Sequence, residues 1–524
     1  MKSHSELFYC EGVINTAEFI RALHSEPSAY FTPPKLKWEQ APSFYPLRFG
    51  ADVIRFKSHG NNVQTAQSSW SKLDALGQWL WKSYAAHQTT VISKPSNSGV
   101  KKQILVRRVL PSGGACYPND IYLSFGEDWG PLLSGYIWVY MPQHHALASH
   151  SANNLPTIDL DQVSISLVTI LSRTAFKYRE FAYRLTAVDT GVLLGRLIGT
   201  SKEFCSSLYV DLSPQVSQID IIDPEEILSA NVLVNLNTEY DKVESFLDSG
   251  PEVLRVETSL RKRHKAISSG QPSIFTDLYP ILMRDTEKVS KKKTITEWLK
   301  SDEHCEPQTS VEKNIIGNNA NTQKRADYSI AMLDQRRSNI DKFTGKACPL
   351  LALNSCVENA DALVSQLSML DSSNFTCDVE FMATALNVQS ICKGTLSYNR
   401  SKSRFHCLQK GNIEQAIQKG MLIQSSDITS SCFIIHVVTR FNWKSKSLNL
   451  RQYRNSQMLV GAAIDAISMT AVNLGLSSHT FLGFSAPAVA RFYGINTDEN
   501  AKVTAQICVG YAKSLNILEA PIVR

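Results

Sequence analysis

The chain has 524 residues, of which 43% are hydrophobic and 19% are charged. This is enough apolar sequence for a large buried core and too long for one ordinary domain, so we expect two domains. The formal net charge of +6 is mild, and the short basic runs lack interleaved aromatic residues, which argues against a nucleic-acid partner.

Cysteine usage and hydropathy indicate the compartment. Eleven cysteines are scattered along the chain, the number is odd, and none forms a CxxC pair. Reduced thiols packed as small core residues fit this pattern, and we predict no metal site. The amino terminus lacks the apolar stretch of a signal peptide, and no run of eighteen apolar residues occurs. We therefore expect a soluble cytoplasmic protein with no membrane partner.

The first readable pattern follows an N-terminal extension, residues 1–60, to which the sequence assigns no role. An apolar run at 121–125 predicts a strand. After Tyr183-Arg184, apolar residues recur at the spacing of one helix face, which predicts a long helix. We place a first domain of mixed helix and sheet at residues 61–240.

A charged connector separates this domain from a second one. Residues 241–329 are charged and locally poor in apolar residues, which is typical of a partly helical linker. Beyond it, an apolar run at 432–438 predicts a strand, and Tyr453-Arg454 opens another long helical pattern. The second domain is placed at residues 330–524.

The two domains share a weak internal repeat with an offset of about 260 residues, which is the size of a domain rather than of a solenoid unit. A tyrosine followed by His-x-Leu occurs in both halves, and so does a Tyr-Arg pair followed by a glycine. The second motif occurs at Tyr183, Arg184 and Gly191, and again at Tyr453, Arg454 and Gly461. Recurrence in the same order predicts a duplication.

One segment carries a resemblance to a known family. PSGGACYP, from Pro111 to Pro118, resembles the PSxGAxYP motif of SagB-type (McbC-like) azoline dehydrogenases, a branch of the nitroreductase-like FMN flavoproteins. Residues 176–184 resemble that family's Lys-Tyr motif followed by Tyr-Arg, and the similarity covers residues 70–235 and 330–515. The resemblance implies an α+β nitroreductase fold, with two tandem nitroreductase-like domains forming an intrachain pseudo-dimer that binds FMN.

In the first domain, the resemblance makes Pro111, Ser112, Gly113 and Gly114 flavin contacts. Two adjacent glycines allow a backbone to approach a flat isoalloxazine ring closely and to point its amides at the polar edge. Taken alone, the tetrapeptide is better explained as an ordinary Pro-Ser-Gly turn; Ala115, Tyr117 and Pro118 favour the flavin contact.

In the second domain, Arg336, Arg337 and Ser338 resemble the phosphate-binding opening of nitroreductases. Two guanidiniums and a hydroxyl suit a phosphate. The family usually has a further arginine two positions after the serine, where this chain has Ile340, so the phosphate site is expected to be shifted. A solvated basic cluster is the alternative interpretation.

Gly483 and Phe484 occupy the place where a glycine backbone meets the flavin in the family; otherwise Gly483 is simply part of a turn. The halves do not carry the same motifs. The repeat offset sets residues 369–376, which lack glycine and proline, opposite the glycine-rich segment, and sets Ser447-Leu448 opposite the Lys-Tyr pair. Complementary motifs predict one FMN site between the halves and one degenerate site.

Lys177 and Tyr178 are the catalytic pair that the resemblance implies. Aromatising an azoline ring removes a hydride from one ring carbon and a proton from its neighbour, and the proton needs a positioned base. A neighbouring ammonium can lower the pKa of a tyrosine and make its phenolate a usable base. Which of the two residues accepts the proton stays open, and a surface lysine beside a packed tyrosine is the simpler alternative.

The resemblance therefore implies an FMN-dependent dehydrogenase that converts thiazoline or oxazoline rings of a ribosomally synthesised peptide to thiazole or oxazole. Its partners would be the precursor peptide and a cyclodehydratase or other peptide-modification enzymes. A general NAD(P)H-dependent nitro or quinone reductase is an alternative with the same fold. A flavin-free scaffold of a peptide-modification complex is the third.

Overall fold

The computed structural model describes most of both predicted domains. The described residues are 9–10, 13–14, 16–25, 52–56, 72–96, 99–150, 158–214, 226–237, 253–255, 343–371, 377–411, 413–422, 428–440, 449–513 and 518–521. Within these ranges, no helix combines the length and the apolar character needed to cross a membrane.

The first half of the chain builds an eight-stranded antiparallel sheet in the order β10-β11-β9-β6-β7-β8-β3-β12. Its strands are β3 (Asp52–Arg55), β6 (Asn119–Phe125), β7 (Ile137–Met141), β8 (Ala146–His150), β9 (Val163–Ile170), β10 (Cys205–Asp211), β11 (Glu226–Leu236) and β12 (Val253–Arg255). The central β9 is buried along its whole length, as its β-branched sequence VSISLVTI favours. Strand β3 lies in the expected N-terminal extension and β12 in the expected connector, so both regions add strands to this sheet.

The second half builds a six-stranded antiparallel sheet in the order β15-β14-β13-β16-β18-β17. Its strands are β13 (Asp378–Ala385), β14 (Gly394–Asn399), β15 (Arg404–Lys410), β16 (Phe433–Arg440), β17 (Ser477–Phe481) and β18 (Ala501–Gly510). Read from β17, this order is the order of the first sheet from β10 to β8. The predicted duplication is confirmed at the level of topology.

The strand registers show the duplication at the level of single residues. In the first sheet, the pairing of β9 with β11 skips Ser229, and in the second the pairing of β16 with β18 skips Thr504. A β-bulge inserts one unpaired residue and bends its strand, so it is a specific local feature. Its occurrence at the same place in both sheets aligns Ser229 with Thr504.

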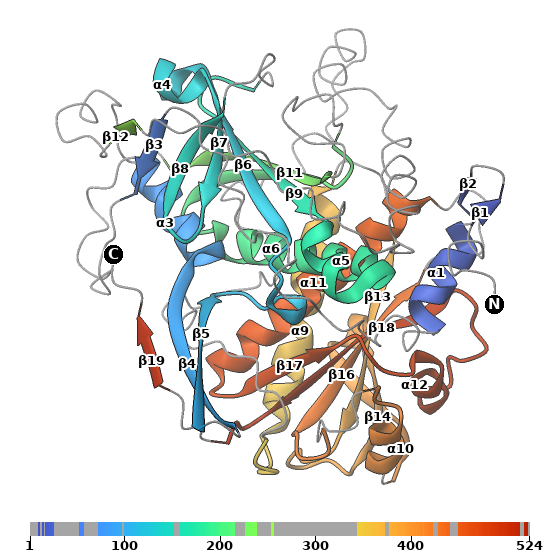
Figure 1. Cartoon of the computed structure of the whole chain (residues 1–524). Coiled ribbons are helices and arrows are strands. Elements are labelled where there is room, and N and C mark those ends of the chain that lie inside the picture. Colours follow the sequence, from blue (N-terminus) through green and yellow to red (C-terminus); the bar gives the residue numbers. More distant parts are fainter. Residues whose placement is uncertain are drawn as a thin grey trace, which may run out of the picture.

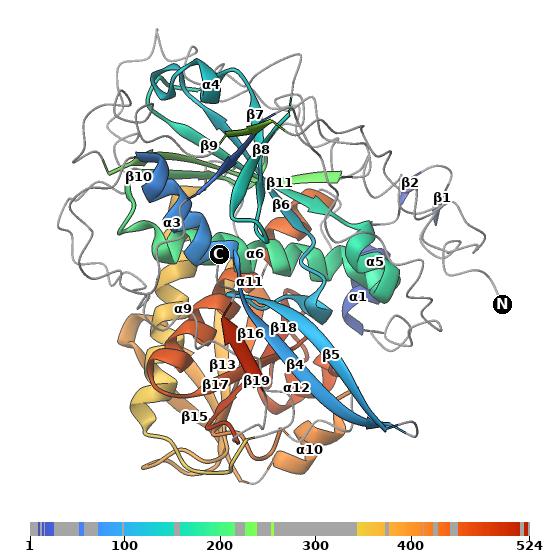
Figure 2. The same ribbon diagram turned by 60° about the vertical axis from the view of Figure 1, so that its left-hand side comes forward.

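Four long helices lie between the two sheets, as Figures 1 and 2 show. They are α3 (Lys72–Tyr84), α6 (Ala182–Ser201), α9 (Leu350–Leu370) and α11 (Leu450–Asn473). Helices α6 and α11 are those predicted to follow the two Tyr-Arg pairs. Both are buried on nearly every side, which explains why their apolar pattern is broad rather than confined to one stripe. A capping box between Asn449 and Gln452 begins α11.

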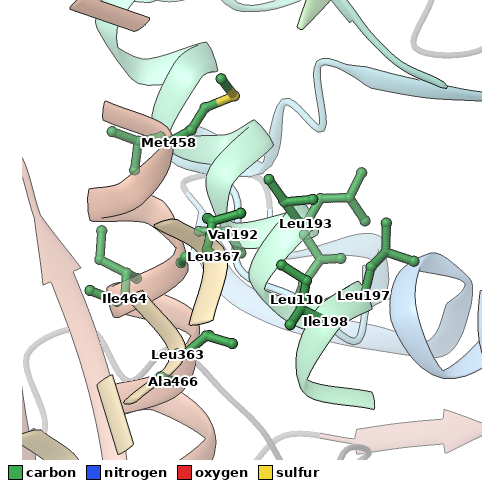
Figure 3. Packing of buried hydrophobic residues seen from close by; sticks show 14 of the residues in the cluster. Leu110, Val192, Leu193, Leu197, Ile198, Leu363, Leu367, Met458, Ile464 and Ala466 are labelled. Carbon is green, nitrogen blue, oxygen red and sulfur yellow. The ribbon is translucent and has the colours of Figure 1, made fainter. Parts of the chain in front are cut away.

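Helices α6 and α11 approach each other so closely that only glycine fits at two positions. A Cβ on Gly191 would lie 2.0 Å from the carbonyl oxygen of Met458, and a Cβ on Gly461 would lie 2.1 Å from that of Val188. The two contacts are related by the duplication, because each glycine faces the residue three positions before the other glycine. Figure 3 shows Val192 and Met458 in the packing beside this crossing.

Each half also sends an arginine into the other half. Arg184 of α6 donates to the backbone oxygen of Thr504, the bulge residue of the second sheet. Arg454 of α11 donates to the hydroxyl of Ser229, the bulge residue of the first sheet, at 3.1 Å. Tyr183 stacks on its counterpart Tyr453, with ring centroids 6.4 Å apart and planes 7° from parallel. The two halves therefore form an intrachain pseudo-dimer around a local two-fold.

A buried ion pair adds a contact that the duplication does not repeat. Arg196 of α6 binds both carboxylate oxygens of Asp465 of α11, at 2.8 and 3.1 Å, and both side chains are fully buried. Arg196 also donates to the backbone oxygen of Val109 at 3.3 Å. This arginine thus ties the helix crossing to the segment that precedes Pro111.

Two further segments span the halves. Helix α1 (Thr16–Ser25) sits against the local two-fold, where Phe19 contacts Tyr183 and His24 Nε2 lies 3.2 Å from the Tyr453 hydroxyl. The hairpin of β4 (Ala86–Ser96) and β5 (Gly99–Arg108) extends along the second half in Figure 2. Strand β19 (Leu518–Pro521), near the end of the chain, pairs with β4.

The crossing of α6 and α11 gives a stability prediction. Gly191→Ala forces a methyl group into backbone atoms, so we expect it to lower the free energy of unfolding by about 3 kcal/mol or more. Gly195→Ala is the control variant, for which we expect a smaller loss of stability. Its Cβ would lie 2.9 Å from Ala462 Cα, whereas the Cβ of Gly191→Ala would lie 2.0 Å from a carbonyl oxygen. Urea unfolding of both variants measures the difference. Equal losses in the two would contradict the assigned crossing.

Candidate functional site

The glycine-rich segment is a strained loop between β5 and β6. Its residues Gly113–Ala115 form one turn of 3-10 helix. Gly114 has a φ of 60°, and the non-glycine residues Ala115 and Tyr117 also have positive φ, at 56° and 43°. Such backbone conformations cost free energy and persist only where the surroundings hold them, and they are enriched at functional sites. Groups around this loop must therefore hold it in place.

The buried carboxylate of Asp189 holds the loop in this conformation. Asp189 of α6 accepts a hydrogen bond from the Ser112 hydroxyl at 2.6 Å and from the Gly113 amide at 3.0 Å. The Ser112 hydroxyl in turn accepts from the Tyr117 amide at 2.9 Å. Burial raises the pKa of Asp189 to about 7, although the bonds from Ser112 and Gly113 lower it.

From the sequence, the loop amides are expected to point at a ligand. Most of them are already engaged: the Gly113 amide bonds Asp189, the Ala115 amide bonds the Ser112 carbonyl oxygen, and the Cys116 and Tyr117 amides also bond within the loop. What the loop offers a ligand is therefore the exposed surface of Gly114 and Ala115.

Lys177 and Tyr178 end the short helix α5 (Ser172–Tyr178). Arg173 fixes this helix to the start of β6 through two bonds to the Asp120 carboxylate, at 2.7 and 2.9 Å. The next residue, Arg179, has a φ of 49° and a ψ of −133°, a conformation that a residue with a side chain rarely adopts. The chain is thus strained directly after the Lys-Tyr pair.

The loop and the Lys-Tyr pair meet at Gly114. A Cβ at this position would lie 2.3 Å from the Tyr178 hydroxyl oxygen and 2.9 Å from Lys177 Nζ. Lys177 and Tyr178 are both half-buried, and Gly114 is exposed. Two motifs that are far apart in the sequence therefore form one surface that combines a side-chain-free backbone, a phenol and an amine.

The electrostatics of Tyr178 differ from the sequence-based expectation. Burial raises its pKa above the usual range, and the neighbouring Cys116 and Asp189 raise it further. A phenolate stabilised by the adjacent ammonium was one of the two candidate bases; the structure instead favours the neutral phenol. Burial also raises the pKa of the Cys116 thiol, to about 12. Cys116 is thus an unreactive packing residue.

Gly483 and Phe484, which were predicted in the second half, are held by contacts within that half. Gly483 accepts a hydrogen bond from the Leu422 amide at 3.1 Å, and the buried Phe484 packs against His436, with ring centroids 6.1 Å apart. Both residues lie between β17 and helix α12 (Ala486–Phe492). The predicted phosphate-binding residues Arg336, Arg337 and Ser338 lie outside the described residues.

The first-half residues present groups that suit contact with a flavin such as FMN: the exposed backbone of Gly114 and Ala115, an amine and a phenol. A Cβ at Gly114 would collide with the Tyr178 phenol and the Lys177 amine, so the glycine lets both side chains approach the loop backbone closely. Pro111 and Ser112 contribute by shaping the loop, since the Ser112 hydroxyl bonds Asp189 and Tyr117. Asp189 was not predicted from the sequence, where it reads only as one polar position within an apolar helix.

Comparisons with known proteins bear on the fold. No family model matches the sequence, and no match was found among curated proteins. A solved structure from Anabaena variabilis, assigned as a nitroreductase, is 17% identical and superposes with a TM-score of 0.62, covering 95% of this chain and 99% of that chain. The chain has the nitroreductase fold. The match extends over both halves, as the tandem arrangement requires.

Shorter structural matches have low scores. The microcin synthetase McbBCD complex of E. coli, with truncated pro-MccB17 bound, is 14% identical and covers 44% of this chain and 81% of that chain, with a TM-score of 0.28. A protein of Ralstonia eutropha, also assigned as a nitroreductase, is 11% identical and covers 35% and 82%, with a TM-score of 0.26.

The raised pKa of Asp189 predicts a pH dependence of stability. An aspartate has a pKa near 3.9 in an unfolded chain, so between about pH 4 and pH 7 the folded chain keeps a proton that the unfolded chain has lost. Stability from this group is therefore present at low pH and declines as the pH rises towards 7, by at most about 1.4 kcal/mol per pH unit.

Asp189→Asn removes this component, so the stability of the variant should rise relative to the native chain as the pH increases from 5 to 8. Urea unfolding of both proteins at each pH measures the difference. A difference that does not change with pH would show that Asp189 titrates in its ordinary range.

Proposed function

We propose that the chain binds FMN between its halves and oxidises azoline rings of a peptide to azoles, with Lys177 and Tyr178 handling the proton. The observation that carries the proposal is the meeting of Gly114 with Tyr178 and Lys177, because the two motifs of the sequence resemblance converge on one accessible surface. The nitroreductase fold is consistent with an FMN-dependent oxidoreductase.

The local two-fold supports a site that both halves complete. In the degenerate half, Asp371 at the end of α9 forms a parallel bridge with Val210 of β10, and its carboxylate accepts from the Leu212 amide at 3.1 Å. The segment before β13 thus touches the chain that follows β10, so the end of α9 in one half meets the other half's edge strand.

The strand registers identify the counterparts of these residues. The pairing of β6 with β9 corresponds to the pairing of β13 with β16, and it makes Asn119 and Val379 counterparts. Pro111 lies as far before Asn119 as Asp371 lies before Val379, so Pro111 and Asp371 are also counterparts. Likewise, the pairing of β10 with β11 and of β17 with β18 aligns the residue after β10, Leu212, with Leu482. By the two-fold, the counterpart of the contact between Asp371 and Leu212 would join Pro111 to Leu482, next to Gly483.

The proposed chemistry divides between the cofactor and the chain. FMN, when bound, supplies the hydride acceptor. The proton that leaves the neighbouring ring carbon must go to a group beside the glycine loop, where Lys177 and Tyr178 are found. Since burial keeps Tyr178 as a phenol, we assign the tyrosine as a hydrogen-bond donor to the substrate ring. We assign Lys177 as the proton acceptor, with its neutral amine taking the proton to become the ammonium.

The test uses the purified chain with FMN and a thiazoline-containing peptide, scored by mass spectrometry as the loss of two hydrogen atoms per ring. Lys177→Ala should lower kcat by about 10²- to 10⁴-fold, as expected for removal of a general base. Added primary amines should restore part of the rate. Tyr178→Phe should retain FMN and lose about tenfold to a hundredfold in rate, as expected for a lost hydrogen bond.

Full activity of Lys177→Ala would refute the base assignment. Absence of ring oxidation in the native chain, together with rapid NADH-dependent reduction of a nitroaromatic, would instead indicate a general reductase. A purified chain that neither contains nor binds flavin would indicate a scaffold.

A further inference from the structure

Asp189 is a buried carboxylate in the middle of a helix that is otherwise devoted to packing. Its side chain is only 3% exposed, and it lies two residues before Gly191, the glycine at the helix crossing. Burying a carboxylate costs free energy unless its hydrogen bonds compensate. The groups that bond Asp189 belong to the glycine loop, which suggests that the loop is the reason for its presence.

The bonds to Asp189 fix two consecutive residues of the loop. The Ser112 hydroxyl donates to one carboxylate oxygen at 2.6 Å, and the Gly113 amide lies 3.0 and 3.3 Å from the two oxygens. Because Ser112 also accepts from the Tyr117 amide, the carboxylate supports both ends of the strained turn. Gly114 lies between these anchored residues and faces Tyr178.

The second half provides an internal comparison. The helix crossing aligns Gly191 with Gly461, so the residue two positions earlier in α11, Leu459, is the counterpart of Asp189. Leu459 is also buried but apolar. The segment aligned with the glycine loop there has neither glycine nor proline. The half with the loop therefore has the carboxylate, and the half without the loop has a leucine at the same buried position.

We infer that Asp189 is the positioning residue of the flavin-facing loop: it holds Ser112 and Gly113 so that the exposed Gly114 lies directly against Lys177 and Tyr178. This inference rests on the proposed flavin site for its purpose, but the positioning itself is a property of the chain without a ligand. Neighbouring ionisable groups are Cys116 in the loop, Tyr178 on α5 and Tyr84 on α3.

Hydrogen exchange of the flavin-free chain, measured by mass spectrometry over residues 111–118, tests the positioning directly. The variants are Asp189→Leu, which copies the second half, and Asp189→Asn, which keeps one acceptor oxygen. Leu459→Asn is the matched control, since it places a buried amide at the equivalent position of α11. FMN affinity by fluorescence titration and the urea midpoint are measured on the same proteins.

In Asp189→Leu we expect protection to fall by about tenfold or more at the Ala115, Cys116 and Tyr117 amides, which bond within the loop rather than to Asp189. Asp189→Asn should be intermediate and Leu459→Asn unchanged in this segment. FMN affinity should fall by about tenfold or more in Asp189→Leu, with a urea midpoint no lower than that of Leu459→Asn.

A loss of protection confined to the Gly113 amide would overturn the inference, because Asp189 would then be only a local hydrogen-bond partner. Unchanged FMN affinity in Asp189→Leu would overturn it as well. If the native chain binds no FMN, the proposed function fails, and the exchange of the loop amides still decides whether Asp189 positions the loop.

Discussion

The backbone contact between α6 and α11 is the constraint on which the rest of the structure depends. Carbonyl oxygens occupy the space beside Gly191 and Gly461 that a side chain would need. At this spacing Arg184 and Arg454 can each reach the β-bulge of the opposite sheet, and Arg196 can pair with Asp465 inside the core. The two halves are consequently one folding unit, with a hydrophobic core that runs through both.

The geometry of the candidate site depends on this contact between α6 and α11. Helix α6 starts just after the Lys-Tyr pair and carries Asp189 beneath the glycine loop, so the position of α6 sets the positions of both. The site also contains the features that cost stability: positive φ at Ala115 and Tyr117, a strained Arg179 and a buried carboxylate. The second half has Leu459 at the place of Asp189, which is the pattern expected when only one of two duplicated sites is retained.

Much of this organisation could be predicted from the sequence. The Tyr-Arg pairs with their glycines correctly marked the two central helices, and PSGGACYP with Lys177 and Tyr178 correctly marked segments that meet in space. Asp189 was missed because a single carboxylate in a buried helix has no pattern of its own; only the fold shows what it contacts. The sequence suggested a lowered pKa for Tyr178 because it reveals a neighbouring lysine, but it does not reveal the burial that raises this pKa.

The sequence also did not predict segments whose role depends on contacts formed in the folded chain. Strands β3 and β12 are short and lie in regions that read as an extension and a connector, and α1 becomes informative only when it is seen against Tyr183 and Tyr453. The strand registers supplied what the weak repeat could not, because the shared β-bulge aligns the two halves residue by residue.

The central claim is that the pseudo-dimer retains one flavin site and has lost the other. Reconstituting the chain with excess FMN, removing free cofactor and quantifying released flavin against protein concentration tests it most directly. The account predicts one FMN per chain. Two FMN per chain would show that the second half retains a working site despite its altered loop, and would contradict the account.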